Sequence, residues 1–373
     1  MITTSLSDRL DAALRGEELT WRALGTTSTG LLEACAALQI STLLHHRLAG
    51  TRHDDWPDDV RRELARTAHA SAAVEMIRSR ETASVLNALA ASGIHPILLK
   101  GAPLAHVVYD APALRPHADT DLLIRREEID IIKSTMRGQG YVESLLSNGE
   151  LLFCQFAMVR RDPFGVEHAF DFHWKISTQS MFAAVLQYDE LAAAALPVPA
   201  LGPHARCAGA IHALLLACIH PVMHHRNTER PIWLYDIHLL MSRLPDVELD
   251  RFANLAVDTR MAAICMHQLT LARARFGTPV PDRVTARLSA RGTPEPSETY
   301  LHPSRRWHHE LASNVRGLPR FRDRLRLMRE VLFPPPRYML ASYRLRGYAV
   351  IVLPVLYGHR LVNGLWNVVS GRK

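Results

Sequence analysis

Hydrophobic positions recur at three- and four-residue spacing over the first quarter of the chain, from about Ser5 to Ser92. Ala, Leu, Arg and Glu dominate this stretch, and that spacing with that composition predicts helices. Residues 50–59 break the pattern, and Gly93 is the expected cap at the end of the second helix. We therefore predict an N-terminal helical region over residues 1–93.

The pattern changes between residues 94 and 204. His95 to Lys100 is a short apolar run bounded by Pro96 and Gly101, which predicts a buried strand followed by a short helix. The further elements expected are a strand over 122–124, an amphipathic helix over 127–138, an extended segment from Gly140, and a hairpin of 153–160 with 166–174 around the turn 162–165. The fold class predicted is α+β, a small mixed-sheet core flanked by N-terminal and C-terminal helical regions.

Helical spacing returns after the Pro-rich passage 196–203 and defines a C-terminal helical region over 205–373. Residues 279–306 are the expected linker within it, and residues 316–331 are predicted to form a basic helix. The apolar stretch 348–358 is about half the ~20 residues that a membrane-spanning helix requires, so we expect no transmembrane segment.

Composition narrows the class of protein. Of the 373 residues 48% are hydrophobic, which is enough to bury sizeable cores and excludes a disordered or collagen-like chain. The five cysteines are scattered without a CxxC pair, and the N-terminus shows no apolar signal segment, so we expect a reduced, cytoplasmic location. The net charge of +7 is unevenly placed: residues 301–373 carry 14 basic and three acidic side chains, so residues 1–300 are slightly acidic.

Candidate chemistry gathers in the middle region. Asp119 and Asp121 lie two apart beside a predicted strand, so their carboxylates point to one face. Asp171 lies in an alternating segment that can pair beside that strand. Three convergent carboxylates suit two Mg²⁺ ions, which clamp the attacking and leaving oxygens of a phosphoryl displacement. Gly101, between a strand and a helix, lets phosphate oxygens approach backbone N–H groups.

The order of these motifs is that of a known enzyme superfamily. The motifs are Leu98-Leu-Lys-Gly101, Arg115, Asp119-Thr-Asp121 with three aliphatic residues, and Asp171-Phe-His-Trp174. This order resembles the DNA polymerase β-like nucleotidyltransferases, and more closely a widespread bacterial family of uncharacterised nucleotidyltransferases. The resemblance covers residues 94–175 and continues more weakly over 220–240.

The resemblance implies roles for particular residues. Asp119 and Asp121 would bind both metal ions, and Asp171 would bind the catalytic ion and help to deprotonate the acceptor. Lys100 and Arg115 would neutralise triphosphate charge, and Gly101 with its neighbour Ala102 would line the triphosphate. His173 would contact nucleotide or brace Asp171, and Lys175 is a further candidate for nucleotide binding. The chain departs from the family pattern at Ala102, where Gly or Ser is usual, and at Thr120, where an aliphatic residue is usual.

Other features have simpler readings. An isolated D-x-D pair is often a solvated strand end. Lys100 is either an ordinary cation at a strand end or a functional residue, and the presence of only four lysines beside 40 arginines favours function. His220 and His224 share a helix face, as zinc ligands do, but no Glu follows His220 and Pro221 interrupts the helix, so we expect them in the wall of the cleft. The arginines of 316–331 form a solvated face or bind nucleic acid, an acidic peptide or an anionic membrane surface.

The resemblance therefore predicts transfer of a nucleoside monophosphate from an NTP, expected to be ATP, to a hydroxyl of a small molecule or peptide, with release of pyrophosphate. Mg²⁺ is the expected cofactor, as two ions, with Mn²⁺ as a substitute. A nucleic-acid acceptor is not favoured, because residues 1–300 are slightly acidic. The alternatives are a non-catalytic nucleotide-binding scaffold and a toxin-like nucleotidyltransferase that modifies tRNA.

Overall fold

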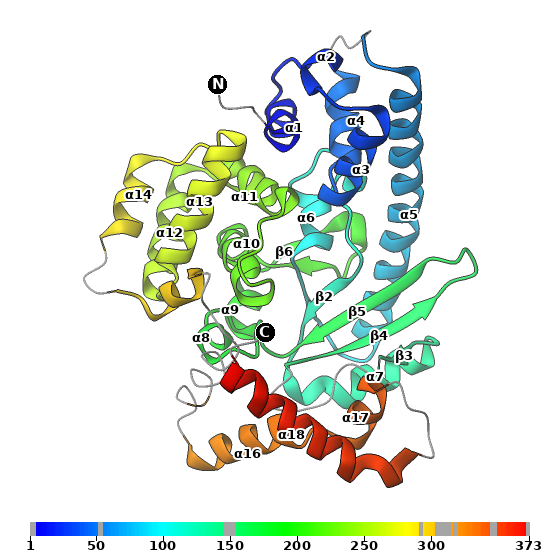
Figure 1. The fold of residues 1–373 in the computed structure, drawn as a ribbon, viewed down its shortest axis with the longest axis vertical. Helices are drawn as coiled ribbons and strands as arrows, with labels where there is room; N and C mark the ends of the chain where they lie inside the picture. Colours follow the sequence, from blue (N-terminus) through cyan, green and yellow to red (C-terminus); the bar gives the residue numbers. More distant parts are fainter. Residues whose placement is uncertain are drawn as a thin grey trace.

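Helices surround a mixed sheet in the computed structural model of the chain (Figure 1). The structure describes residues 5–50, 55–144, 154–290, 294–302, 315, 320–343 and 349–370. Before the sheet come α1 (Leu6–Leu14), α2 (Trp21–Leu24), α3 (Ser28–Leu38), α4 (Ser41–Ala49) and the long α5 (Asp58–Ala91). The predicted helical character of this region is confirmed.

The sheet has seven strands in the order β3-β4-β5-β2-β1-β7-β6. Their bounds are β1 (Ile97–Leu99), β2 (Thr120–Leu123), β3 (Val142–Glu143), β4 (Gln155–Arg161), β5 (Glu167–His173), β6 (Leu196–Pro197) and β7 (Arg206–Cys207). The pairs β2–β5 and β1–β7 are parallel and the others antiparallel, so the predicted mixed sheet and α+β class are confirmed. Strand β2 begins two residues earlier than predicted, because Asp121 itself pairs with Leu99 of β1.

Short helices connect the strands. These are α6 (Gly101–Val107), η1 (Pro112–Leu114), η2 (Arg126–Glu128), α7 (Ile129–Gly138), α8 (Ser180–Ala183), α9 (Tyr188–Ala193) and η3 (Pro199–Leu201). The predicted hairpin is the pair β4–β5, although Phe153 lies outside the described residues. The expectation of continuous helix from residue 205 is wrong at its start. Residues 206–207 form β7, which pairs with β6, and the boundary predicted at residue 204 lies inside that hairpin.

The C-terminal half is helical: α10 (Ala210–His224), α11 (Pro231–Arg243), α12 (Asp246–Asp258), α13 (Ala262–Phe276), α14 (Asp282–Ser289) and η4 (Pro296–Leu301). The predicted linker 279–306 was wrong over α14, where Val284 and Leu288, four residues apart, are both fully buried. The last elements are α16 (Phe321–Leu332), α17 (Pro336–Ser342), η5 (Ala349–Val352) and α18 (Leu353–Ser370). Of the predicted basic helix, residues 316–319 lie outside the described residues.

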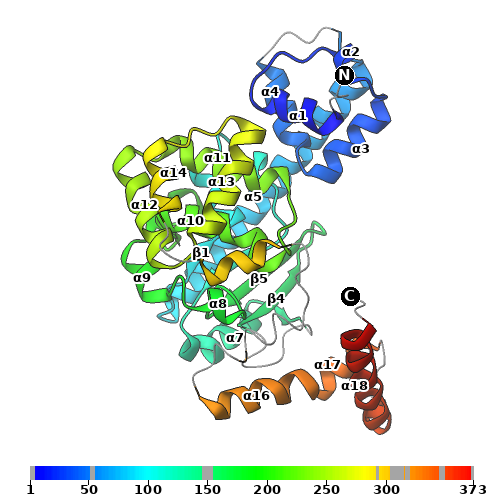
Figure 2. The same ribbon diagram turned by 60° about the vertical axis from the view of Figure 1, so that its left-hand side comes forward.

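Two groups of buried side chains hold the molecule together. One lies between β1, α6 and the helices α10 to α14, and it extends to α1, α3 and α4. The other lies on the opposite side of the sheet, under the end of α5 and α7. Figure 2 shows α16 and α18 beyond the sheet, at the end of the molecule away from α1 to α4. No helix among the described residues has both the length and the apolar character needed to cross a bilayer.

Candidate active site

The centre of the site is a pair of carboxylates on neighbouring parallel strands. Asp121 of β2 is directly opposite Asp171 of β5, and the next pair is Leu122 with Phe172. Since side chains alternate between the faces of a strand, the fully buried Leu122 and Phe172 point into the apolar cluster under α5. The same alternation directs both carboxylates to the other face. The apolar side of the sheet therefore fixes the two acids side by side.

Two nitrogen-bearing side chains contact Asp121. The Lys100 ammonium donates to Asp121 Oδ1 at 2.7 Å, and His173 Nε2 lies 2.7 Å from the same oxygen. Lys100 follows β1 with φ 58° and ψ −134°, a backbone conformation that side-chain-bearing residues rarely adopt. Residues held in such conformations cluster at functional sites, where the surrounding structure keeps them. The strained turn directs the Lys100 side chain towards β2.

The two carboxyl groups are electrostatically different. Burial alone would raise the pKa of Asp121, but the Lys100 ammonium and the hydrogen bond from His173 hold it well below its usual value. Burial and the neighbouring Asp121 charge raise the pKa of Asp171 to about 6. Asp121 is therefore a permanent anion at neutral pH, whereas Asp171 exchanges a proton close to physiological pH.

A divalent cation fits this arrangement. One ligand atom from each of Asp121, Asp171 and His173 lies within 4.8 Å of the other two. Among the described residues, this is the one group of three or more acidic, His or Cys side chains close enough together to hold a metal ion. His173 Nδ1 is buried without a hydrogen-bond partner, so the ring's orientation is fixed by Asp121 alone. The two carboxylates are the hard oxygen ligands that suit Mg²⁺ or Mn²⁺. The imidazole of His173, whose Nε2 hydrogen-bonds to Asp121, would orient that carboxylate. The cation would also relieve the repulsion that raises the pKa of Asp171.

Asp119 lies outside that group. It precedes β2, and the residue as a whole is exposed. Partial desolvation of its carboxyl group and the Asp121 charge raise its pKa. Its backbone carbonyl accepts from His117 Nδ1 at 2.9 Å, and His117 Nε2 in turn lies 3.1 Å from the buried Glu75 of α5. The structure thus brings together two of the three predicted carboxylates, with His173 in place of Asp119.

Glu75 is a functional candidate that the sequence did not reveal. It also contacts His106 of α6 at 3.3 Å and accepts from Ser79 at 2.9 Å. Although burial opposes it, hydrogen bonds from His106 and His117 lower the pKa of Glu75 to about 2. The residue lies in a regular helical pattern, where nothing in the sequence distinguishes it from a solvent-facing acid. This network holds α5, α6 and the Asp119 loop together.

Arg115 contacts a carboxylate of the helical half. Its guanidinium donates two hydrogen bonds of 2.8 Å to Asp236 of α11, which also accepts from Tyr109 at 2.7 Å. A Cβ at Gly101 would meet the guanidinium atoms at 3.4 Å, so Arg115 lies directly against the Gly101 backbone. Sequence reasoning assigned Arg115 to triphosphate charge, but its charge is already balanced by Asp236 in this buried pair.

The remaining predicted residues are distributed around the carboxylates. Gly101 and Ala102 begin α6 and are buried, and Lys175 is exposed just beyond β5. The hydrogen bond of His173 goes to Asp121, whereas the sequence had suggested Asp171 as the residue it braces. Asp171 Oδ2 instead accepts from Gln155 of β4 at 3.3 Å, a contact that the hairpin register creates by placing Gln155 opposite His173.

His220 and His224 lie in the helical wall near the carboxylates. His224 Nε2 lies 3.0 Å from the carbonyl of Ile176, and the His220 ring packs edge-on against Trp233 with centroids 5.1 Å apart. Burial and the nearby Lys100 charge lower the pKa of His224 to about 3, and the same causes lower that of His220 well below its usual value. Both rings are therefore neutral at physiological pH.

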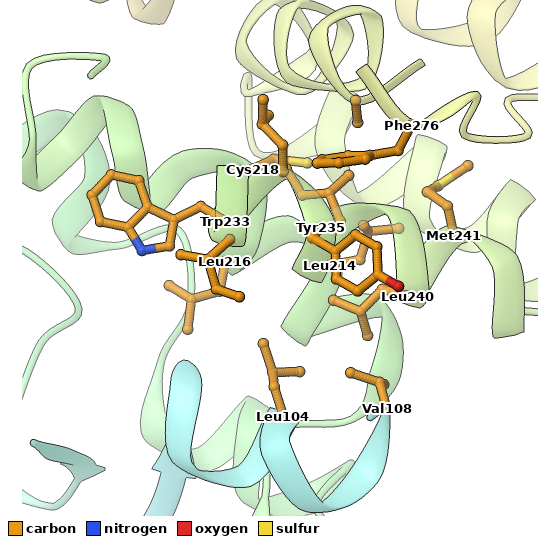
Figure 3. Close-up of a cluster of buried hydrophobic side chains, with 14 of the residues drawn as sticks. Leu104, Val108, Leu214, Leu216, Cys218, Trp233, Tyr235, Leu240, Met241 and Phe276 are labelled. Carbon is orange, nitrogen blue, oxygen red and sulfur yellow. The ribbon is translucent and has the colours of Figure 1, made fainter. Parts of the chain in front are cut away.

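An apolar cavity of about 160 Å³ lies beside Lys100, between α6 and the helices α10 and α11. Figure 3 shows Leu104 of α6 and Val108, directly after that helix, facing Leu216, Trp233 and Leu240; all five are among the lining residues. Lys100 and His220 also belong to the lining. The cavity therefore reaches the residue whose ammonium binds Asp121.

A protein-family model matches the part of the chain that contains this site. The model of a family described as uncharacterised nucleotidyltransferases matches residues 26–277, about two thirds of the chain. This chain belongs to that family. The matched residues include the whole sheet, the carboxylate pair and helices α10 to α13. A comparison with curated proteins found no match.

Proposed function

We propose that the protein transfers a nucleoside monophosphate from an NTP, with ATP as the first candidate, to a hydroxyl of an acceptor molecule. Membership of a nucleotidyltransferase family supports the reaction class. The observation that carries the proposal is the placement of Asp121 and Asp171 opposite each other on parallel strands, with His173 within 4.8 Å. Asp121 is buried and Asp171 is half-buried. Two carboxylates so close together repel each other, and this repulsion favours binding of a cation.

Asp121 and Asp171 would hold the first Mg²⁺ ion, with His173 orienting Asp121, and the exposed Asp119 would help to hold a second. When bound, Mg²⁺ polarises the phosphoryl oxygens and lowers the pKa of a coordinated hydroxyl. Lys100 remains a candidate for neutralising triphosphate charge, as the resemblance implies, and a cation bound at Asp121 would compete with the ammonium that now lies 2.7 Å from this carboxylate. Gly101, Ala102 and Lys175 remain candidates for nucleotide binding, as the resemblance implies.

Arg115 has a supporting role in this proposal. Its guanidinium lies against Gly101 and is held by Asp236, so it positions the turn between β1 and α6. Because a buried, fully paired guanidinium loses two hydrogen bonds when it turns to another anion, direct contact with triphosphate is disfavoured. We assign Arg115 to positioning of the Lys100–Gly101 backbone.

The chemical step requires a proton acceptor. The acceptor oxygen attacks the α-phosphorus, the bond from that phosphorus to the pyrophosphate oxygen breaks, and the hydroxyl proton leaves. Asp171 is the candidate to take this proton, because its carboxylate lies beside Asp121 at the proposed cation site, where the acceptor hydroxyl would be bound. The amide of Gln155 would orient its Oδ2.

The cavity indicates the chemistry of the acceptor. Its walls are mainly apolar, and its volume of about 160 Å³ matches cavities of about 150 Å³ that admit a single aromatic ring. We propose that a small molecule or peptide side chain with a compact apolar group occupies it. An Ala217→Leu change, which fills the cavity wall, should reduce transfer to such acceptors, while Ala91→Leu at the exposed end of α5 should not.

The test is release of pyrophosphate from each of the four NTPs with Mg²⁺ and a panel of hydroxylated acceptors with and without apolar groups. Asp121→Asn and Asp171→Asn should each lower the rate by at least about a thousandfold, since both remove a cation ligand. The matched control is Asp130→Asn, at an exposed position of α7. Circular dichroism of each variant separates loss of chemistry from loss of folding.

Two alternatives make different predictions for the same experiment. A non-catalytic nucleotide-binding scaffold would bind Mg-ATP in calorimetry without releasing pyrophosphate under any condition. A tRNA-modifying enzyme would release pyrophosphate only with tRNA, and its affinity for RNA would fall steeply with salt. Either result would replace the proposed small-molecule or peptide acceptor.

A further inference from the structure

The C-terminal helices lie outside the part of the chain that the family model matches. That match ends at residue 277, whereas α16 begins at Phe321. Residues 301–373 carry 14 basic and three acidic side chains. The described elements there contact one another: α16 and α17 both pack against α18. We call α16, α17, η5 and α18 the C-terminal arm.

Helix α16 exposes an apolar stripe. Phe321 and Leu325, four residues apart, are 70% and 55% exposed, and Met328 and Leu332 continue the same face. Leu327, which is 3% exposed, marks the side of the helix that packs, and Arg360 of α18 donates to the Val331 carbonyl at 3.3 Å. Phe321 and Leu325 are open to solvent, whereas Met328 and Leu332 are half-buried.

Arginines border this stripe. At helical spacing Arg322 and Arg329 lie along one edge and Arg324 lies along the other, and Arg322 and Arg329 are exposed. A solvated helix places charges over its whole outer face. Here the exposed face mixes Phe321 and Leu325 with Arg322, Arg326 and Arg329. Apolar side chains and arginines are thus presented together, as in a helix that lies in a membrane interface.

The rest of the arm shows the same character. Ile351 of η5 is 89% exposed, and Val355 and Val362, seven residues apart on one face of α18, are 71% and 65% exposed. Phe333, directly after α16, is 53% exposed. A surface built to bind RNA would present mainly aromatic rings for stacking beside its arginines. Among the described residues of the arm, the exposed aliphatic side chains of Leu325, Ile351, Val355 and Val362 outnumber the two exposed phenylalanine rings, Phe321 and Phe333.

We propose that the C-terminal arm binds the surface of an anionic phospholipid membrane, with the apolar stripe of α16 in the acyl boundary and the arginines at the headgroup phosphates. The arginines are attracted to the anionic headgroups, and burial of the apolar side chains adds to the affinity. The transferase body would then work beside the bilayer.

The experiment is sedimentation of the full-length protein with vesicles of phosphatidylcholine alone and of phosphatidylcholine mixed with phosphatidylglycerol. Binding is expected only to the anionic vesicles, with an affinity that falls as salt is raised. Phe321→Ala with Leu325→Ala, and separately Arg322→Gln with Arg329→Gln, should each weaken binding by about tenfold or more. Phe164→Ala, at a hairpin turn where Phe164 is 80% exposed, is the matched control and should bind normally.

Four results would overturn the proposal. The protein could remain in the supernatant with anionic vesicles, or both double variants could bind as well as wild type. It could also bind tRNA through the same residues and not bind vesicles, which would make the arm a nucleic-acid surface. Sedimentation equilibrium of the vesicle-free protein checks the fourth: a dimer broken by the Phe321→Ala and Leu325→Ala changes, without vesicle binding, would show that a second copy covers the stripe.

Discussion

At the residue scale, the site depends on how unequally its environment treats two identical carboxyl groups. Asp121 receives both the Lys100 ammonium and the His173 imidazole at 2.7 Å. Asp171, directly opposite it, has only the Gln155 amide at 3.3 Å. Asp121 is therefore a fixed anion, while Asp171 combines a place in the cation site with the capacity to accept a proton.

The raised pKa of Asp171 predicts how cation affinity depends on pH. A proton and a cation compete for this carboxylate, so below pH 6 the affinity for Mn²⁺ should fall by up to about tenfold per pH unit. Above pH 7 it should level off. Calorimetric titration of Mn²⁺ from pH 5 to 8 measures this, and Asp171→Asn should weaken binding and flatten the profile. An unchanged slope in that variant would assign the proton to another group.

At the scale of elements, buried polar contacts join helices to the loops around the sheet. Glu75 of α5 contacts His106 of α6 and His117 of the loop before β2. Arg115, Tyr109 and Asp236 connect α11 to the loop after α6. Through His117, α5 contacts the loop that carries Asp119, and through Arg115, α11 is connected to the turn that carries Lys100 and Gly101.

The lowered pKa of Glu75 predicts a stability difference with a definite sign. A carboxyl whose folded pKa is about 2 stabilises the protein above its unfolded pKa of about 4.5, and this contribution disappears as the pH falls towards 2. Urea unfolding should therefore show that the advantage of wild type over Glu75→Gln shrinks by roughly 1–2 kcal/mol between pH 5 and pH 3. Glu33→Gln, exposed on α3, is the control and should show no such change. A constant difference would mean that Glu75 is not stabilised as an anion.

The Arg115–Asp236 pair predicts a large effect from a single change. Asp236→Leu leaves a buried guanidinium without its partner and should lower the free energy of unfolding by about 3–5 kcal/mol. Adding Arg115→Met should recover much of that loss, because no uncompensated charge remains. Asp250→Leu, which breaks the exposed pair with Arg283, should cost at most about 1 kcal/mol. Denaturant titrations of wild type, Asp236→Leu, Arg115→Met and the double variant measure the coupling, and additive losses would contradict it.

At the scale of the whole molecule, the C-terminal arm is separate from the two apolar clusters. Both clusters are made of residues up to Tyr300, and none of their members lies in α16 to α18. Within the described residues the arm buries only a few apolar side chains, among them Leu327 and Met339. The body that carries the carboxylates thus has its own core.

A chain that ends at His302 should therefore fold and keep its affinity for Mg-ATP, with a thermal midpoint within a few degrees of the full-length protein. It should also lose vesicle binding. Differential scanning calorimetry and nucleotide titration of both chains make the comparison. A chain that aggregates or unfolds would show that the arm stabilises the body.

The sequence by itself determined the local elements and the identity of the acids. Short apolar runs bounded by Pro and Gly predicted β1 and the hairpin, because strand formation follows from period and residue type. The spacing of Asp119, Asp121 and Asp171 predicted the proposed cation site for the same reason. Tertiary structure decided which groups meet. The pairing of β2 with β5 selected Asp121, Asp171 and His173, and long-range packing joined Arg115 to Asp236 and Glu75 to His117. Such contacts span up to 121 positions along the chain, a distance over which neither periodicity nor propensity carries information.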